Sequence, residues 1–473
     1  MLGVKAPKLA KIPAIKPKAT PKTVAAKAKK AAEPQDQTVQ TETEVTDVGT
    51  SSLYNEKYLK FLNDQFNAIE KTYEVSSSSA VRPDRFSTGL LVVDFISSGG
   101  IASGIMANFI GQEASSKTTL VLNTLGQSLK MPLAVRVLND AESALDPEYA
   151  SALFGQDSAK IFESKQIRYY DTPSLEGFFR STAAMARRLP NKRWHTEANT
   201  FCLEWPNKQG ALKQISELGF KVDRKLSDEA IYRVLIDNTN PQGIVVLDSL
   251  AALLTDRQTD EETEDKQRMA ERAGAFSNEL PRLVSLLSKK AITFFSVNQL
   301  RKNPGVMYAS SSYEPGGEAI KFNTSFRCEI RSIWPPYVKN EVSVEPSVEV
   351  KDGHDTYAYK EIKNKKSKIG KPFLSGTVRV WVSDGTGKAR GYCPVFDTYT
   401  YLKLTGRIGK VTGPEFKPNK LQTLTSPPFE GTWSDFKLWV LKGKGVGVRA
   451  KLFQELKTEE LKARQAAIQN AKK

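Results

Sequence analysis

Apolar residues follow two patterns along the chain, and each pattern predicts a different kind of element. In residues 54–73 they recur at helical spacing, which predicts an amphipathic helix with one apolar face. Further along, short and mostly apolar runs occupy 105–110, 133–138, 243–248 and 292–297. Such runs are typical of strands buried on both faces of a parallel sheet. The pattern therefore predicts an α/β protein with a mostly parallel twisted sheet flanked by helices.

The first 52 residues have the composition of a disordered tail and linker. Residues 1–30 hold nine lysines and no acid, together with several prolines and alanines. Such a segment cannot bury enough apolar surface to fold alone. It carries +9 of the net charge of +16. Two interpretations stay open: a solubilising tail, or an arm that binds DNA without regard to sequence by neutralising its phosphates.

Composition excludes several classes of protein. No run reaches the roughly 18 to 20 apolar residues that a membrane span needs. The three cysteines lie far apart and there are only two histidines, so neither a disulfide framework nor a zinc site is expected. These features predict a cytoplasmic protein with no membrane partner. The positive net charge indicates a polyanionic partner such as nucleic acid.

A loop of small residues after the run at 105–110 predicts a phosphate-binding P-loop. In a P-loop, backbone N–H groups and a helix N-terminus converge on the anion. Lys117 would contact the β- and γ-phosphates, and the Thr118 hydroxyl would bind Mg²⁺. The residues of this candidate nucleotide loop are Gly111, Gln112, Glu113, Ala114, Ser115, Ser116, Lys117, Thr118 and Thr119.

Ser116 departs from the P-loop pattern because it stands where glycine is usual. If the loop needs a left-handed backbone there, a serine costs about 1 to 2 kcal/mol. We expect nucleotide binding to be retained, and we leave the rate of turnover open.

Polar residues follow three of the predicted strands, where an open parallel sheet binds its ligands. Glu142 comes after 133–138 and could be a base that activates water, or it could cap the next helix. Taken alone, the cap is the stronger interpretation. Asp248 ends the run at 243–248 in the manner of a Walker-B acid, which holds Mg²⁺. Gln299 follows the run at 292–297.

These and further motifs, in this order, resemble the RecA recombinases over roughly residues 55–395. The segments that carry the resemblance are 86–89, 111–119, 140–142, 144–147, 149–150, 246–249, 251–253, 298–301, 305–307, 316–317, 319–322 and 362–365. The resemblance implies a RecA-like ATPase core at 86–393, which uses ATP and Mg²⁺. It also implies an N-terminal polymerisation helix with its linker at 53–85 and, more weakly, a small α/β DNA-binding domain at 394–473.

The resemblance also implies roles for single residues in hydrolysis. The residue that matches Glu142 activates the attacking water, and the one that matches Gln299 senses the γ-phosphate. Those that match Asp146 and Tyr149 contact adenine. Lys363 and Lys365 would reach a neighbouring subunit's ATP, which ties hydrolysis to a homo-oligomeric helical filament; the alternative is a solvated basic run.

Two segments correspond to the DNA loops of the family. The segment 300–317 combines cations with apolar or aromatic side chains, as proteins that bind single-stranded DNA do; its alternative is an ordinary surface loop. Its candidate DNA-binding residues are Arg301, Lys302, Met307, Tyr308, Gly316 and Gly317. The segment 256–269 holds six acids, so any DNA contact there must come from Arg257, Lys266 or Arg268.

Two stretches depart from the family's usual layout. Residues 151–242 are longer than the corresponding stretch, and their aromatic residues predict an ordered excursion rather than a linker. At the other end, a glycine-rich basic segment at 442–451 precedes a predicted helix at 450–471. This segment could hold phosphates of duplex DNA, or it could be a solvent-facing loop.

The function that the resemblance implies is an ATP-dependent recombinase. It would form filaments on single-stranded DNA and pair that strand with homologous double-stranded DNA, in the bacterial nucleoid or in the cytoplasm of a phage-infected host. Two alternatives stay open: a DNA-coating structural protein with a weak or lost ATPase, which the serine in the P-loop and the lysine-rich tail would suit, and a RecA-fold helicase or motor.

Overall fold

The computed structural model describes Asp64 and residues 84–473, except for 196–197, 261–264, 303–311, 334–349, 353–354, 384–390, 414–417, 444, 446 and 472–473. The predicted tail at 1–52 and the helix at 54–73 therefore lie outside the described residues, apart from Asp64. The same holds for Met307 and Tyr308 of the predicted DNA loop.

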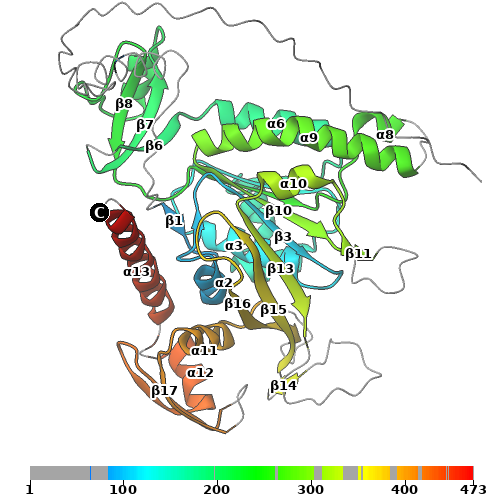
Figure 1. Ribbon diagram of the computed structural model, residues 1–473, viewed down its shortest axis with the longest axis vertical. Helices are drawn as coiled ribbons and strands as arrows, with labels where there is room; N and C mark the ends of the chain where they lie inside the picture. The colour runs from blue at the N-terminus through cyan, green and yellow to red at the C-terminus, as the bar shows by residue number, and fades with distance from the viewer. Residues whose placement is uncertain are drawn as a thin grey trace, which may run out of the picture. The chain divides into compact units, whose positions relative to one another are not determined.

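A nine-stranded sheet forms the centre of the fold, with strand order β14-β15-β13-β3-β10-β9-β4-β5 and β16 paired to β15 (Figure 1). The six strands from β13 to β5 run parallel, whereas β14, β15 and β16 extend the sheet in antiparallel fashion. The strands are β3 (Met106–Gly111), β4 (Val135–Asp140), β5 (Arg168–Tyr170), β9 (Gly243–Asp248), β10 (Ile292–Gln299), β13 (Phe326–Ser332), β14 (Val350–Asp352), β15 (Asp355–Ser367) and β16 (Ser375–Ser383).

The four predicted strands correspond to β3, β4, β9 and β10; β9 has the predicted bounds, whereas the other three end one or two residues later than predicted. β4 and β10 each continue two residues further than the apolar runs suggest. The reason is the pairing with neighbouring strands of the sheet: Asp140 is in register with Asp248 of β9, and Gln299 with Gly111 of β3. Backbone hydrogen bonds to a neighbouring strand therefore carry each strand past its last apolar residue.

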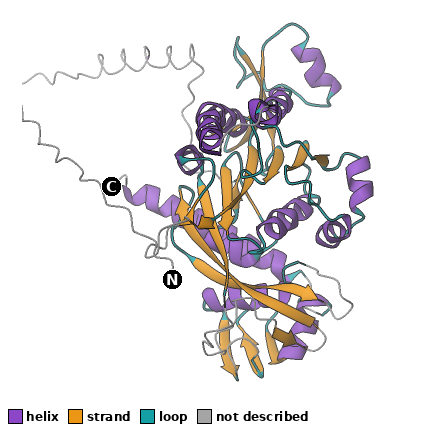
Figure 2. Ribbon diagram, turned by 90° about the vertical axis from the view of Figure 1, so that its right-hand side faces the viewer, coloured by secondary structure: helices purple, strands orange, loops and turns teal. Residues whose placement is uncertain are grey.

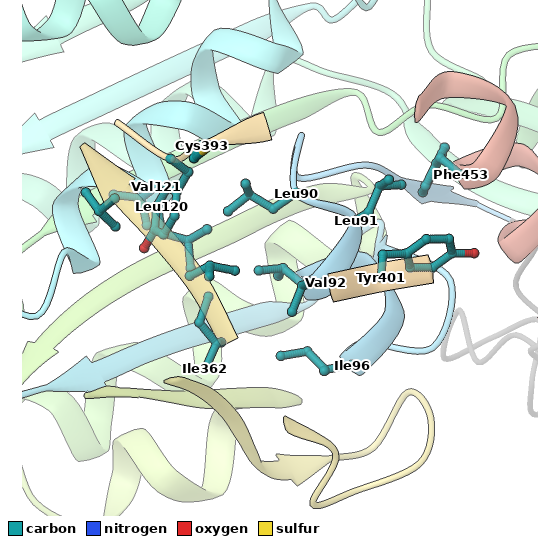
Figure 3. Close-up of a cluster of buried hydrophobic side chains, with 14 of the residues drawn as sticks. Leu90, Leu91, Val92, Ile96, Leu120, Val121, Ile362, Cys393, Tyr401 and Phe453 are labelled. Atoms are coloured by element: carbon teal, nitrogen blue, oxygen red, sulfur yellow. The ribbon is translucent and has the colours of Figure 1, made fainter. Parts of the chain in front are cut away.

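Helices cover both faces of the sheet because side chains alternate along each strand. In β9, Val245 and Leu247 pack under α6 and α9, whereas Ile244 and Val246 join the opposite cluster. Figure 3 shows part of that second cluster, where residues of α2, α3, β15, α11 and α13 meet. The helices of these layers are α2 (Leu91–Ile96), α3 (Lys117–Ser128), α6 (Leu175–Arg187), α9 (Asp265–Lys289), α10 (Glu318–Asn323), α11 (Pro394–Leu404) and α13 (Val448–Ala471).

Shorter elements connect these layers. They are β1 (Arg85–Phe86), β2 (Ile101–Ala102), α4 (Pro147–Phe154), α5 (Ser158–Glu163), α8 (Asp256–Asp260), β11 (Arg301–Lys302) and β12 (Ser312–Tyr313). In the described part of the chain, no helix is both long and apolar enough to cross a membrane.

The excursion within 151–242 contains a folded subdomain, which confirms the prediction of order there. β6 (Asn191–His195), β7 (Thr200–Pro206) and β8 (Ile231–Ile236) form an antiparallel sheet with α7 (Ala211–Glu217). Trp205 and Ile215 are buried in its small core. On β7, Glu204 makes ion pairs with Arg193 (3.1 Å) and Arg233 (3.2 Å), so charged neighbours on all three strands tie the sheet together.

The C-terminal residues add a three-stranded sheet and two helices (Figure 2). These are β17 (Ile408–Thr412), β18 (Lys420–Thr423), β19 (Phe429–Thr432), α12 (Trp433–Leu441) and α13, which begins two residues before the predicted helix at 450–471. Their apolar side chains, such as Phe436 and Leu452, belong to the same buried cluster as α2 and α3. A domain boundary at residue 394 therefore stays a prediction.

Candidate nucleotide-binding site

The loop between β3 and α3 has the backbone geometry that the sequence predicts. Ser116 is the N-cap of α3 and lies in the left-handed region, with φ 70° and ψ 30°. Its side chain makes no capping hydrogen bond, so the serine hydroxyl does not compensate for this backbone conformation. Ala114 also has a positive φ of 54°. The loop therefore holds two side-chain-bearing residues where glycine would be easier.

Gly111 is required at the start of the loop for a different reason. A Cβ at this position would lie 2.3 Å from the Ile330 carbonyl oxygen and 2.5 Å from Ser115 Oγ. Both distances are far shorter than a carbon can approach, so only glycine lets the loop turn this close to β13.

Lys117 is buried at the first position of α3, 7% exposed, and its ammonium points back into the loop. Its Nζ donates to the Gln112 carbonyl (2.6 Å) and to Ser115 Oγ (3.1 Å). Burial lowers the pKa of Lys117, while the charges of Asp248, Glu142 and Glu113 act in the opposite direction. An anion that enters the loop would thus meet an ammonium group that the loop itself already holds in place.

Thr118 and Asp248 lie together at the C-terminal edge of the sheet, as a Mg²⁺ site requires. The Asp248 carboxylate accepts a hydrogen bond from the Thr118 side chain. Burial is the main cause that raises the pKa of Asp248 to about 6, and the charges of Glu142 and Asp140 act in the same direction. A cation beside this carboxylate would relieve the unfavourable burial of its charge.

The residues present fit a Mg²⁺ ion that is shared with a nucleotide. The described residues contain no group of three or more His, Cys, Asp or Glu side chains that could hold a metal by themselves. Mg²⁺ is usually bound by one or two protein oxygens together with phosphate oxygens and waters. Thr118 and Asp248 supply such a partial set.

Glu142 lies in the site instead of capping a helix. Its Oε1 accepts a hydrogen bond from Ser249 Oγ (2.5 Å) and one from Gln299 Nε2 (3.3 Å). The next helix, α4, is capped by Asp146, whose side chain accepts from the backbone N–H of Glu148 (2.9 Å). The capping interpretation of Glu142 is therefore wrong, because Asp146, four residues later, caps α4.

Of the two predicted adenine contacts, Tyr149 lies on α4 beside the loop, and Asp146 is the N-cap of the same helix. The Tyr149 hydroxyl lies 2.8 Å from Thr119 Oγ1, which places the ring beside the start of α3. Burial raises the pKa of Tyr149. Tyr392 is a neighbour that the sequence did not suggest, and its hydroxyl donates to the Ser116 carbonyl (3.0 Å). No local pattern marks a contact that spans 276 positions.

Lys363 and Lys365 lie on β15 and, among the described residues, neither makes a hydrogen bond to the loop at 111–119. Lys363 is paired in register with Glu329 of β13. Lys365 makes an ion pair with the same glutamate, with 3.0 Å between Nζ and Oε2. The two lysines are therefore outside the nucleotide site of their own chain.

The described part of the predicted DNA loop begins at the end of β10, next to the nucleotide site. Arg301 and Lys302 form β11, and Arg301 is exposed. Gly316 and Gly317 have positive φ values of 96° and 76°, which only glycine adopts easily. In the acidic segment 256–269, Arg257 pairs with Glu271 (3.5 Å), so one of its three candidate cations already has a partner.

Comparison with known sequences agrees with this geometry. Residues 59–166 and 227–386 match the RecA N-terminal domain, and the match leaves out 167–226, which includes β6, β7 and α7. A relative named Protein RecA from Arthrospira platensis is 26% identical over 330 residues, which is 68% of this chain and 70% of the relative. The Protein RecA of Thermus aquaticus is 25% identical over 359 residues, 74% of this chain and 82% of the relative. The chain therefore belongs to the RecA family of ATP-dependent recombinases, and the predicted fold class is confirmed.

Proposed function

We propose that this member of the RecA family is a DNA-dependent ATPase that polymerises on single-stranded DNA and pairs it with a homologous duplex. One observation carries the proposal: three groups with complementary chemistry lie at one edge of the sheet. They are Lys117 in the loop at 111–119, the buried carboxylate of Asp248, and Glu142, whose carboxylate is fixed by hydrogen bonds. A coating protein that had lost its ATPase would have no need of this convergence.

In the proposed reaction, each group of the site has a separate task. The loop and Lys117 bind the phosphates, and Thr118 and Asp248 would hold Mg²⁺, which neutralises charge that develops on the phosphoryl oxygens. Glu142 orients the attacking water and takes its proton, as a general base does. Ser249 and Gln299 hold that carboxylate in place through their hydrogen bonds.

Gln299 also supplies a route by which DNA could control hydrolysis. Its side chain donates to Glu142, and the chain continues from Gln299 through Leu300 into β11 and the proposed DNA loop. A shift of that loop on DNA would move Gln299 and change the position of the base. Hydrolysis would then respond to DNA without any contact between DNA and nucleotide.

We propose that Lys363 and Lys365 complete the nucleotide site of a neighbouring subunit. In the single chain, Lys365 is paired with Glu329, so it must exchange this partner on assembly.

The proposal predicts complementation between two inactive variants. A Lys117→Ala chain lacks a working loop but supplies both lysines, whereas a Lys363→Ala/Lys365→Ala chain has the loop but lacks the lysines. Their mixture should hydrolyse ATP faster than the sum of the two alone, and a merely additive rate would rule out the shared site.

DNA binding would involve the loop after Gln299, the N-terminal tail and the C-terminal residues from 394 on. If the tail engages about five phosphates of single-stranded DNA, it contributes about −3.5 to the slope of log affinity against log salt concentration. Deleting residues 1–32 should flatten that slope by this amount. An unchanged slope would leave the tail with no role in DNA binding.

The function itself is tested by pairing of DNA strands. Wild-type protein with ATP should pair a labelled single strand with a homologous duplex and should not pair it with a heterologous one. Glu142→Gln should still assemble on single-stranded DNA but should disassemble slowly, because hydrolysis releases subunits. If the protein coats single strands but never distinguishes homologous from heterologous duplex, the structural coating role replaces the recombinase. We propose that the recombinase activity takes place in the cytoplasm.

A further inference from the structure

A second lysine lies at the nucleotide loop, on a strand far from it in the sequence. Lys360 belongs to β15 and is only 4% exposed. Its Nζ donates to the carbonyl oxygen of Ala114 (2.9 Å), three residues before Lys117, and to Ser332 Oγ (2.8 Å). Ser332 is the cross-strand partner of Lys360 on β13. The ammonium is therefore held between the sheet and the loop.

The charge of Lys360 has no partner of opposite sign among the described residues. Its two acceptors are a carbonyl and a hydroxyl, and no carboxylate forms an ion pair with it in that part of the chain. Burial lowers the pKa of Lys360, and the charge of Lys117 lowers it further. Two buried ammonium groups thus face the same loop and repel one another.

A buried charge without a counter-charge is unfavourable unless a ligand supplies one. The loop at 111–119 has the form of a site for polyanions, and Lys360 is anchored to its backbone. We propose that Lys360 is a second cation of the nucleotide site, a positioning residue that fixes the loop through Ala114 and whose counter-charge comes from the bound phosphates. This inference rests on the proposed function, since it assumes that the loop binds a nucleotide.

The simpler alternative is that Lys360 only ties β15 to the loop. The two roles differ in how they depend on the ligand's charge. A structural tie would affect all nucleotides equally and would also lower the stability of the protein without nucleotide. A second cation would favour ligands with more phosphates. Its removal would change the stability little, because the loss of two hydrogen bonds is offset by the loss of a repulsion between buried charges.

The test compares equilibrium binding of ATP and AMP to the full chain with Lys360→Met. This change keeps the approximate length of the side chain and removes its charge. We expect ATP binding to weaken by about tenfold or more, which is the usual effect of losing an interaction with a charged group at a buried site. AMP binding should weaken by less than about twofold. The unfolding temperature of the nucleotide-free protein should stay close to that of the wild type.

Two further variants make the result decisive. Lys360→Gln removes the charge but keeps a donor for Ala114, so it replaces the methionine variant if that one does not fold, with the same expected loss of ATP binding. Lys366→Met is the matched control. Lys366 is another lysine of β15 whose ammonium binds a backbone carbonyl, that of Lys321, away from the loop. This control should bind ATP and AMP as the wild type does.

The outcomes separate the inference from the proposed function. If wild type binds ATP and Lys117→Ala does not, but both neutral variants of Lys360 bind ATP normally, the inference is wrong and the nucleotide site stands. An equal loss of ATP and AMP binding would also overturn it, in favour of the structural tie. If the wild type itself fails to bind ATP, the proposed function fails first.

Discussion

Replacing Ser116 by glycine should stabilise the protein while leaving its affinity for nucleotide almost unchanged. Ser116 holds φ at 70°, where a residue with a Cβ is less stable than glycine by about 1 to 2 kcal/mol. Glycine also gains freedom in the unfolded chain, which offsets about 0.4 to 1 kcal/mol of this. The serine side chain makes no capping hydrogen bond that the change would remove. The net gain in the free energy of unfolding is then about 1 kcal/mol.

Nucleotide affinity should change little because the left-handed conformation is present before any ligand binds. The strain belongs to the folded state with or without nucleotide, so it cancels in the binding equilibrium. We expect the dissociation constant for ATP to stay within about twofold, whereas the unfolding temperature should rise by about 2 °C or less in a chain of this size.

The assay is thermal unfolding of the nucleotide-free protein, together with equilibrium ATP binding, for wild type, Ser116→Gly and Ser116→Ala. Alanine keeps the Cβ and removes the hydroxyl, so it should match the wild type in both measurements. If Ser116→Gly unfolds at the same temperature as Ser116→Ala, backbone strain at this position is not the explanation. A tenfold change in ATP affinity for the glycine variant would show that the loop rearranges on binding.

Three further predictions follow from single contacts. The pKa of Asp248 is about 6 in the folded protein and about 4 in the unfolded chain. Between about pH 4 and pH 6 the folded state therefore holds a proton that the unfolded state has lost. Stability should therefore fall as pH rises through that window, and Mg²⁺-dependent ATP binding should weaken below about pH 6; Asp248→Asn should remove both trends. Ser249→Ala removes one of the two bonds that hold Glu142, so kcat for ATP hydrolysis should fall several-fold with KM unchanged; an altered KM alone would contradict this. Arg379→Met should lower the free energy of unfolding by about 2 to 4 kcal/mol in denaturant titrations, because the buried guanidinium stacks on Phe396 (4.3 Å) and donates to the Tyr359 hydroxyl (2.7 Å). Stability within about 0.5 kcal/mol of wild type would mean that the loss of these contacts is balanced by relief of the buried charge.

Local patterns predicted the framework of the nucleotide site well. Apolar runs located β3 and β9 because a strand buried on both faces needs apolar residues at nearly every position. The left-handed Ser116 could also be expected, since the loop geometry is a local property of a few residues. Each of these features depends on neighbours in the sequence.

Features that depend on distant contacts could not be predicted in the same way. Glu142 had a local explanation as a helix cap, and what places it in the site instead is its bonds to Ser249 and Gln299, 107 and 157 positions away. Lys360 reaches Ala114 across 246 positions and carries no motif. A side chain's neighbours in the fold, and so its charge environment, are set by the order of strands in the sheet.

The central claim is that ATP hydrolysis by this chain is coupled to single-stranded DNA. The direct test is the steady-state rate of ATP hydrolysis by the full chain with and without single-stranded DNA, measured in parallel for Lys117→Ala and Glu142→Gln. We predict a marked stimulation of the wild type by DNA and loss of hydrolysis in both variants, with Glu142→Gln still binding ATP. A rate that is indifferent to DNA, or normal hydrolysis by Glu142→Gln, would contradict the account.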